Sequence, residues 1–225
     1  MMADSAGPFR FFVEGADDFH AILNLLARHE LSRETLPQKF PPFRDPKIEH
    51  GQGKDAVLRA IETAVKVNSN ESVGFVLDAD DDISARWESV AQRLQNVGVD
   101  IGAGLDPAGF LGESSEYGTR VGVWLMPDNR QAGRLEDFLE GLVDQTNPLL
   151  PHAQEATNGA KALGAAFSDT KASKAVLHAW LAWQQEPGRP YGIAIKSGYL
   201  RHDSAAAERF VAWFRRLFAL EEPTT

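Results

Sequence analysis

The sequence predicts an α/β protein built on a mostly parallel sheet with helices on both faces. Short segments rich in β-branched and aromatic residues alternate with longer segments in which apolar residues recur at helical spacing. Repeated alternation of strand and helix is typical of parallel sheets covered on both sides. The segment 72–77 ends in a continuous apolar run, the pattern expected of a strand in the middle of such a sheet.

The first third of the chain is expected to supply two outer strands and the central strand. Residues 9–13 are aromatic and β-branched, which favours a strand, and Asp17 or Asp18 is a candidate N-cap for the helix that follows. Four prolines predict a loop over residues 35–46. The other elements expected here are a weak strand at 47–50, an amphipathic helix at 54–67 and the central strand at 72–77.

The remainder of the chain continues the alternation. Apolar residues at helical spacing predict helices at 84–97 and 134–144, on either side of a strand at 120–126. The glycine-rich segment 99–118 is expected to be irregular, with room for one short strand. The last elements expected are a loop over 145–170, a helix over 171–185, a strand over 191–195 and a final helix capped by Asp203.

The expected domain organisation is a core of residues 1–145 with a C-terminal helical extension, residues 146–225, packed on it or continuous with it. A chain of 225 residues with 43% hydrophobic content can bury a sizeable core. Aromatic residues near the C-terminus recur at helical spacing, which favours core packing or a homo-oligomer interface over base stacking. These residues are Trp180, Trp183, Phe210, Trp213, Phe214 and Phe218.

Composition excludes several classes of function. The chain has no cysteine, so disulfides, thiol catalysis and zinc–thiolate sites are excluded. It shows neither an apolar run long enough to span a membrane nor a signal-peptide pattern, and we expect a soluble cytoplasmic protein without a membrane partner. The net charge of −9 disfavours general nucleic-acid binding, although bound cations reverse a local acidic field.

The acidic string that follows the central strand is the strongest functional signal. Asp78, Asp80, Asp81 and Asp82 follow the apolar run directly, and like charges held close together repel each other. Asp81 and Asp82 are explained by a solvated turn or a helix N-cap. Asp78 and Asp80 alternate with Ala79, so in extended geometry both carboxylates would point to one side and suit a hard cation such as Mg²⁺.

Three known motifs with such acids fit the sequence incompletely. An EF-hand loop starting at Asp78 would need Gly and Glu at the positions that Ile83 and Ser89 occupy. A haloacid-dehalogenase phosphatase places its Asp-x-Asp after the first strand, whereas here a strand–helix–strand unit precedes it. The Asp-x-Asp of a nucleotide-sugar glycosyltransferase fits the local string but leaves Glu14, at the end of the first expected strand, unexplained.

The order of the acids resembles that of the Toprim domain of topoisomerases, primases and the overcoming-lysogenisation-defect nucleases. These proteins carry a Glu after the first strand and Asp-x-Asp after a later strand. The stretch "FFVEGADDFHAILNLL" supplies Glu14, and "VGFVLDADDD" supplies Asp78 and Asp80. The chain also resembles, over nearly its full length, an uncharacterised Toprim-like bacterial family with the pattern VEG-DD, LDAD, MPDN-G-LEDFL and a late LAW segment.

The nuclease branch of this resemblance implies further site residues. Asp18 stands where the nucleases carry a second acid, more often Glu, and Glu136 matches a Glu on the helix after the next strand. Lys171 and Lys174 match a lysine near the C-terminal end. The residues implied as metal ligands are Glu14, Asp18, Asp78, Asp80 and Glu136.

The resemblance implies metal-dependent phosphodiester cleavage of nucleic acid, DNA or RNA, with Mg²⁺ or Mn²⁺ as cofactor and, as in many small Toprim proteins, an ATPase partner protein. Two such cations neutralise charge and generate hydroxide at neutral pH. Lys171 or Lys174 would stabilise the developing charge, and Glu14 is an alternative general base. Arg130 and Arg134 are candidate contacts for substrate phosphate or ordinary surface charges.

Two alternatives remain open on sequence grounds. The first is a non-catalytic binding or regulatory module that keeps the fold and a metal. The second is an Asp-x-Asp glycosyltransferase-like enzyme, which would bind a nucleoside diphosphate in a metal-dependent way.

Overall fold

The computed structural model describes residues 10–31, 47–50 and 54–220. Within them, one sheet of five strands has the order β2-β1-β3-β5-β4. The strands are β1 (Arg10–Val13), β2 (Lys47–His50), β3 (Ser72–Asp78), β4 (Phe110–Glu113) and β5 (Arg120–Met126). All neighbouring pairs are parallel except β4 and β5, which are antiparallel. The predicted α/β class and mostly parallel sheet are therefore confirmed.

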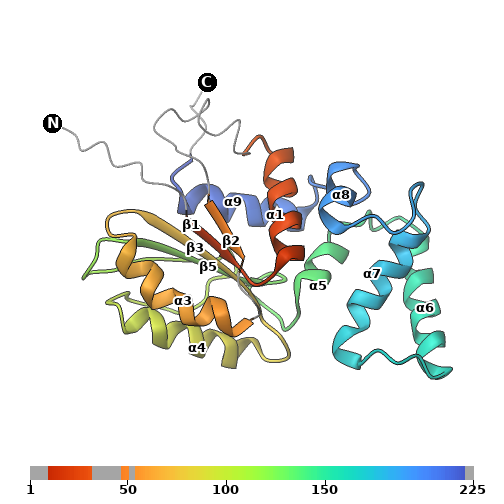
Figure 1. Cartoon of the computed structure of the whole chain (residues 1–225), viewed down its shortest axis with the longest axis horizontal. Coiled ribbons are helices and arrows are strands. Elements are labelled where there is room, and N and C mark those ends of the chain that lie inside the picture. The colour runs from red at the N-terminus through yellow and green to blue at the C-terminus, as the bar shows by residue number, and fades with distance from the viewer. Residues whose placement is uncertain (1–9, 32–46, 51–53, 221–225) are drawn as a thin grey trace.

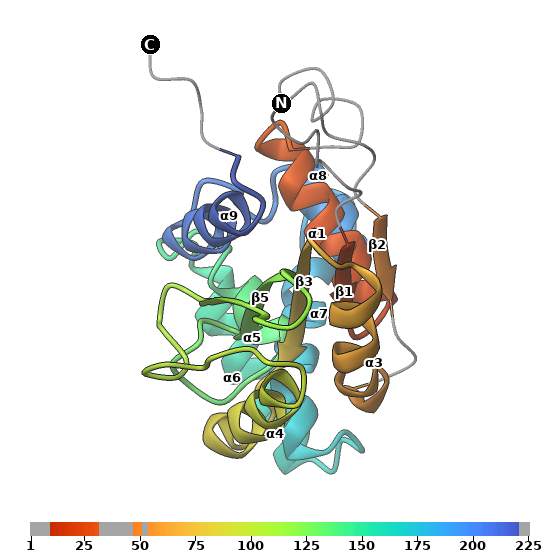
Figure 2. The same cartoon turned by 90° about the vertical axis from the view of Figure 1, so that its left-hand side faces the viewer.

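Side chains alternate between the two faces of the sheet and divide the core in two. Phe11, Val76 and Trp124 belong to one hydrophobic cluster, and Phe75 and Leu77 belong to the other. Helices α1 (Ala16–Arg28) and α9 (Ala205–Leu217) cover the first face, while α3 (Lys54–Val67) and α4 (Ile83–Gln95) cover the second (Figures 1 and 2). Both faces are covered, as the continuous apolar character of β3 predicts.

Four further helices gather at one end of the sheet (Figure 1). They are α5 (Leu135–Glu140), α6 (Leu149–Ala162), α7 (Ala172–Ala182) and α8 (Tyr191–Lys196), and the short 3₁₀ helix Asp169–Lys171 precedes α7. Helix α7 packs against both α5 and α6, and α8 packs against α1. No helix in the described part of the chain is long and apolar enough to cross a membrane.

Two predictions for the C-terminal third were wrong. The segment 145–170 contains helix α6 where we expected only loop, since α6 buries few residues and its apolar periodicity is weak. The segment 191–195 forms helix α8 rather than a strand, and this helix packs along α1. A Cβ on Gly192 would lie 2.6 Å from the carbonyl oxygen of His20, which shows how closely α8 approaches α1.

Two helix caps also differ from expectation. Gly15 is the N-cap of α1, so Asp17 and Asp18 lie in the first turn of this helix, and α9 is capped by Ser204 rather than Asp203. The Ser204 hydroxyl accepts a hydrogen bond from the Ala207 amide at 3.2 Å. The N-cap expected of Asp82 is confirmed, since its carboxylate accepts hydrogen bonds from two backbone amides of α4.

Residues on both sides of position 145 share one hydrophobic cluster. The Phe11 and Phe214 ring centroids lie 5.5 Å apart, and those of Trp124 and Phe210 lie 5.4 Å apart. The aromatic face of α9 therefore packs in the core against the sheet. Trp183 differs, because it is 41% exposed and its ring is tilted against that of His152, with the centroids 5.2 Å apart.

Close contact between α9 and the sheet depends on glycine. A Cβ on Gly122 would lie 2.7 Å from a methyl carbon of Leu217, so we expect Gly122→Ala to lower the free energy of unfolding by about 1–3 kcal/mol. Gly159→Ala in α6 is the control, because its Cβ would meet no described atom within 4 Å and alanine favours helix. Urea denaturation of both variants tests this, and equal stability of Gly122→Ala and wild type would contradict the packing.

Candidate functional site

The site lies at the carboxyl ends of the parallel strands, at the point where the chain stops adding strands to one side of the sheet and starts adding them to the other. From β1 the chain runs through α1 to β2 on one side, whereas from β3 it runs through α4 toward β5 on the other. Adjacent strands that diverge in this way leave a crevice, which is the usual ligand position in open α/β sheets. Glu14 directly follows β1 and Asp78 ends β3, so both acids border this crevice.

A cavity of about 510 Å³ opens at this edge of the sheet. Its acidic lining residues are Glu14, Asp17, Asp18, Asp78 and Glu136. Its basic lining residues are Arg134, Lys171 and Lys174. The structure thus brings together most of the site residues predicted from the sequence, drawn from β1, α1, β3, α5 and the start of α7.

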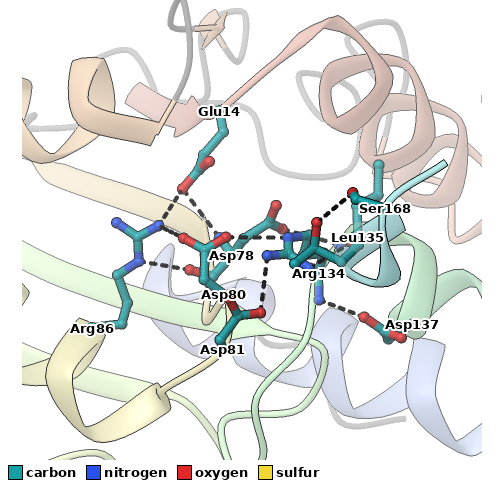
Figure 3. A network of polar contacts seen from close by, with 10 residues as sticks. Glu14, Asp78, Asp80, Asp81, Arg86, Arg134, Leu135, Asp137 and Ser168 are labelled. Atoms are coloured by element: carbon teal, nitrogen blue, oxygen red, sulfur yellow. Dashed lines mark hydrogen bonds and ion pairs between the residues drawn. The ribbon is translucent and has the colours of Figure 1, made fainter. Parts of the chain in front are cut away.

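The carboxylates of Glu14 and Asp78 each accept a hydrogen bond from a backbone amide, which fixes their orientation. The Glu14 Oε1 atom accepts a hydrogen bond from the Asp78 amide at 3.2 Å, and the Asp78 Oδ1 atom accepts one from the Leu135 amide at 3.0 Å (Figure 3). Burial raises the pKa of Glu14 to about 7, although the nearby Arg86 opposes this rise. Burial, and the negative charges of Asp18 and Glu14, raise the pKa of Asp78 to about 8.

Asp18, in the first turn of α1, adds a third carboxyl group to the site, and it is buried like Glu14. Burial, together with the charge of Glu136, raises its pKa to about 6. Neither Asp18 nor Asp78 forms an ion pair with a Lys, Arg or His in the described part of the chain. Buried carboxylates without a counter-ion are destabilised at neutral pH, and a bound cation would relieve this cost.

The carboxylates suit a hard divalent cation in chemistry but are not assembled as a coordination sphere. Carboxylate oxygens are the ligands that Mg²⁺ prefers, and Glu14, Asp18 and Asp78 all face one cavity. Among the residues that the structure describes, however, no three acidic or histidine side chains are grouped closely enough to hold a metal ion. A cation held by all three would require these side chains to move closer together.

Asp80 does not adopt the extended geometry expected of it. Its φ is +55°, and its backbone pairs with that of Gly133. Its Oδ2 atom accepts a hydrogen bond from Arg86 at 2.6 Å, and its Oδ1 atom accepts one from Arg134 at 3.2 Å (Figure 3). Asp80 is also absent from the cavity lining, so the expectation that Asp78 and Asp80 point to one side from an extended segment was wrong.

Arg86, on the first turns of α4, is a site residue that the sequence analysis missed. Its side chain is only 8% exposed, and its Nε atom donates a hydrogen bond to the Asp78 carbonyl oxygen at 2.8 Å. The same guanidinium lies 3.5 Å from Glu14 Oε1 and 2.6 Å from Asp80 Oδ2. A sequence signal existed, because Arg86 shares the buried face of α4 with Val90.

The cations of α7 and the preceding 3₁₀ helix border the cavity in different ways. Lys174 lies 3.0 Å from Glu136 and 3.4 Å from Asp17, and its ammonium sits 5.9 Å from the Tyr191 ring centroid. Its pKa is raised by these acids, although burial opposes the rise. Lys171 is exposed and forms no ion pair with any residue in the described ranges.

The two arginines expected to contact substrate are placed differently. Arg134 lines the cavity and, besides Asp80, contacts the Asp81 carboxylate at 3.2 Å and the Thr170 carbonyl oxygen at 2.8 Å. Arg130 is exposed in the turn after β5 and does not line the cavity. The structure therefore brings Arg134 to the other site residues and leaves Arg130 outside.

Comparison with known proteins identifies a family. Residues 8–219 match the family described as "Protein of unknown function (DUF3226)", and the chain belongs to that family. No curated protein and no solved structure shows a significant match.

Proposed function

We propose that this protein is a Toprim-like, metal-dependent phosphodiesterase that cleaves nucleic acid. The observation that carries the proposal is the cavity at the chain-reversal point, where the buried Glu14 and Asp18 and the half-buried Asp78 have raised pKa values and lie beside exposed and half-exposed cations. Buried acids with perturbed pKa values in a cleft are a frequent feature of catalytic sites. The acids that line the cavity suit Mg²⁺ or Mn²⁺, and the basic residues that line it suit a phosphate group.

The acids of the cavity would bind the metal ion, and its basic residues would contact the substrate. Bound Mg²⁺ or Mn²⁺ would supply charge neutralisation and an activated water. Glu14, Asp18, Asp78 and Glu136 would hold the cation. Lys171, which has no described acid partner, would contact the substrate phosphate first.

The remaining cations would act once the substrate is bound. Arg134 offers a planar guanidinium at the cavity wall for phosphate recognition. Lys174 would exchange its contacts with Glu136 and Asp17 for the developing negative charge. Access to nucleic acid for a chain of net charge −9 is expected to depend on low salt or on a partner, such as an ATPase, that delivers the substrate.

A non-catalytic nucleic-acid-binding module is the second candidate, and one observation favours it. Arg86 and Arg134 already neutralise Asp80, and Arg86 lies beside Glu14, so part of the acidic cluster is compensated by the protein itself. In such a module the fold would be retained without catalysis, and substrate binding would be independent of the carboxylate of Asp78.

Cleavage assays distinguish the two candidates. We expect nicking of plasmid DNA, or cleavage of single-stranded DNA or RNA, at low salt with Mn²⁺ or Mg²⁺, and a loss of at least about 100-fold in Glu14→Gln and Asp78→Asn. Glu88→Gln, which removes an exposed carboxylate of α4, is the matched control and should retain full activity. Equal cleavage by wild type and both site variants would refute the catalytic assignment, and metal-independent binding without cleavage would favour the binding module.

A further inference from the structure

We infer that Asp80 is a positioning residue that holds Arg86 and Arg134, and not a ligand of the cation; this assignment rests on the proposed function. A sequence pattern of Asp-x-Asp treats its two acids as equivalent. In the structure the two acids have different surroundings. Asp78 faces the cavity, whereas Asp80 binds two arginines.

The contacts of Asp80 use both of its carboxylate oxygens. Oδ2 binds Arg86 at 2.6 Å, Oδ1 binds Arg134 at 3.2 Å, and Asp80 lies between the two guanidinium groups in Figure 3. A charge-assisted bond as short as the one to Arg86 is among the stronger polar contacts in proteins. A cation that used Asp80 would have to displace at least one arginine, whereas no arginine in the described ranges contacts the Asp78 carboxylate.

The backbone strengthens the same assignment. Asp80 has a φ of +55°, and its amide and carbonyl groups pair with those of Gly133 at 3.0 and 2.8 Å. This pairing fixes the segment after β3 against the segment that leads to α5. The side chain of Asp80 is thereby directed between Arg86 on α4 and Arg134 at the start of α5, and it does not line the cavity.

Each arginine then acts on a different part of the site. Arg86 reaches from Asp80 to the carbonyl oxygen of Asp78 and toward Glu14, so it sets the spacing of the two strand ends. Arg134 reaches from Asp80 to the Thr170 carbonyl oxygen at the cavity rim. Through the two arginines, Asp80 therefore connects the acids of the cavity to the Thr170 segment, and this is the role of a residue that orients the groups around it.

The test counts the water molecules on bound Mn²⁺, because a lost protein ligand is replaced by water. The full-length protein would be loaded with Mn²⁺. Water-proton relaxation would give the number of water molecules bound directly to the ion, and electron paramagnetic resonance would measure the Kd. For Asp80→Asn we expect the wild-type water number and a Kd raised by about 10-fold or less. For Asp78→Asn we expect about one additional water and a larger loss of affinity.

Metal-free stability gives a second measurement with opposite signs for the two variants. Asp80→Asn should lower the Tm, because buried Arg86 loses its closest acid, and Asn tolerates the positive φ. Asp78→Asn should raise the Tm, because it removes a half-buried carboxylate that has no ion-pair partner among the described residues. Arg134→Met covers the case in which Asp80→Asn folds poorly, and it should leave the water number unchanged.

The outcomes separate this assignment from the proposed function. Extra water on Mn²⁺ in Asp80→Asn, or fewer waters in Arg134→Met because a released Asp80 binds the cation, would overturn the positioning role alone. Absence of Mn²⁺ binding by the wild type would overturn the proposed function and this assignment with it. An unchanged water number with opposite Tm shifts supports the positioning role.

Discussion

Replacing Arg86 by Met is expected to lower the free energy of unfolding by about 3–5 kcal/mol, the usual cost of breaking a buried charge network from one side. The guanidinium is 8% exposed and contacts Asp80 at 2.6 Å, Glu14 at 3.5 Å and the Asp78 carbonyl oxygen at 2.8 Å. Methionine fills similar space but leaves two acids of the site without this cation. Since each kcal/mol corresponds to about 2–4 °C in Tm for a domain of this size, the expected loss is large.

The matched control for Arg86→Met is Arg93→Met on the same helix. Arg93 is half-buried, donates to the Ser89 carbonyl oxygen at 2.9 Å and forms no ion pair with an acid in the described segments. We expect this variant to lie within about 1 kcal/mol of wild type. Urea denaturation would measure both proteins. Similar losses in the two variants would show that packing of α4, and not the charge network, accounts for the effect.

The position of the site could be predicted from the sequence because it depends on a simple rule of topology. Acids at the ends of neighbouring parallel strands meet at one edge of the sheet. Glu14 follows β1 and Asp78 ends β3, the two strands are neighbours, and Asp18 lies in the first turn of the helix after β1. To predict that these acids lie together, it was enough to identify the strands and to recognise that they are parallel neighbours.

The details of the Asp-x-Asp segment could not be predicted in the same way. Alternation of side chains holds only while the backbone stays extended, and Asp80 leaves the extended region to pair with Gly133. The partner Gly133 lies more than fifty residues away, so no local pattern indicates it. Arg86 was missed for a related reason, because an arginine on a helix is normally assigned to the solvent face.

The C-terminal helices illustrate how tertiary contacts override local preference. Tyr191, Ile193 and Ile195 favour a strand by composition, yet residues 191–196 form a helix that packs closely on α1. In α6, only Leu150, Ala153 and Thr157 are buried, too few to produce a clear apolar stripe. Both errors concern helices whose partners are other helices rather than the sheet.

The metal-free protein is expected to lose stability as the pH rises from about 4 to about 8 because of its buried acids. The folded-state pKa values of Glu14, Asp18 and Asp78 are about 7, 6 and 8, compared with ordinary values of 4.5, 3.8 and 3.8. A group whose pKa is raised on folding contributes most below its unfolded-state pKa. That contribution is lost as the pH rises through the folded-state value.

Asp78→Asn isolates the largest of these effects, because Asn cannot ionise. The Tm of this variant relative to wild type should increase from about pH 4 to about pH 8 and then level off, by several degrees in all. Differential scanning calorimetry in chelator-treated buffer would measure both proteins across this range, with Glu88→Gln as control for the loss of one exposed carboxylate. Added Mg²⁺ should stabilise the wild type at high pH and should stabilise Asp78→Asn less. A Tm difference independent of pH would show that Asp78 does not titrate as a buried, uncompensated acid.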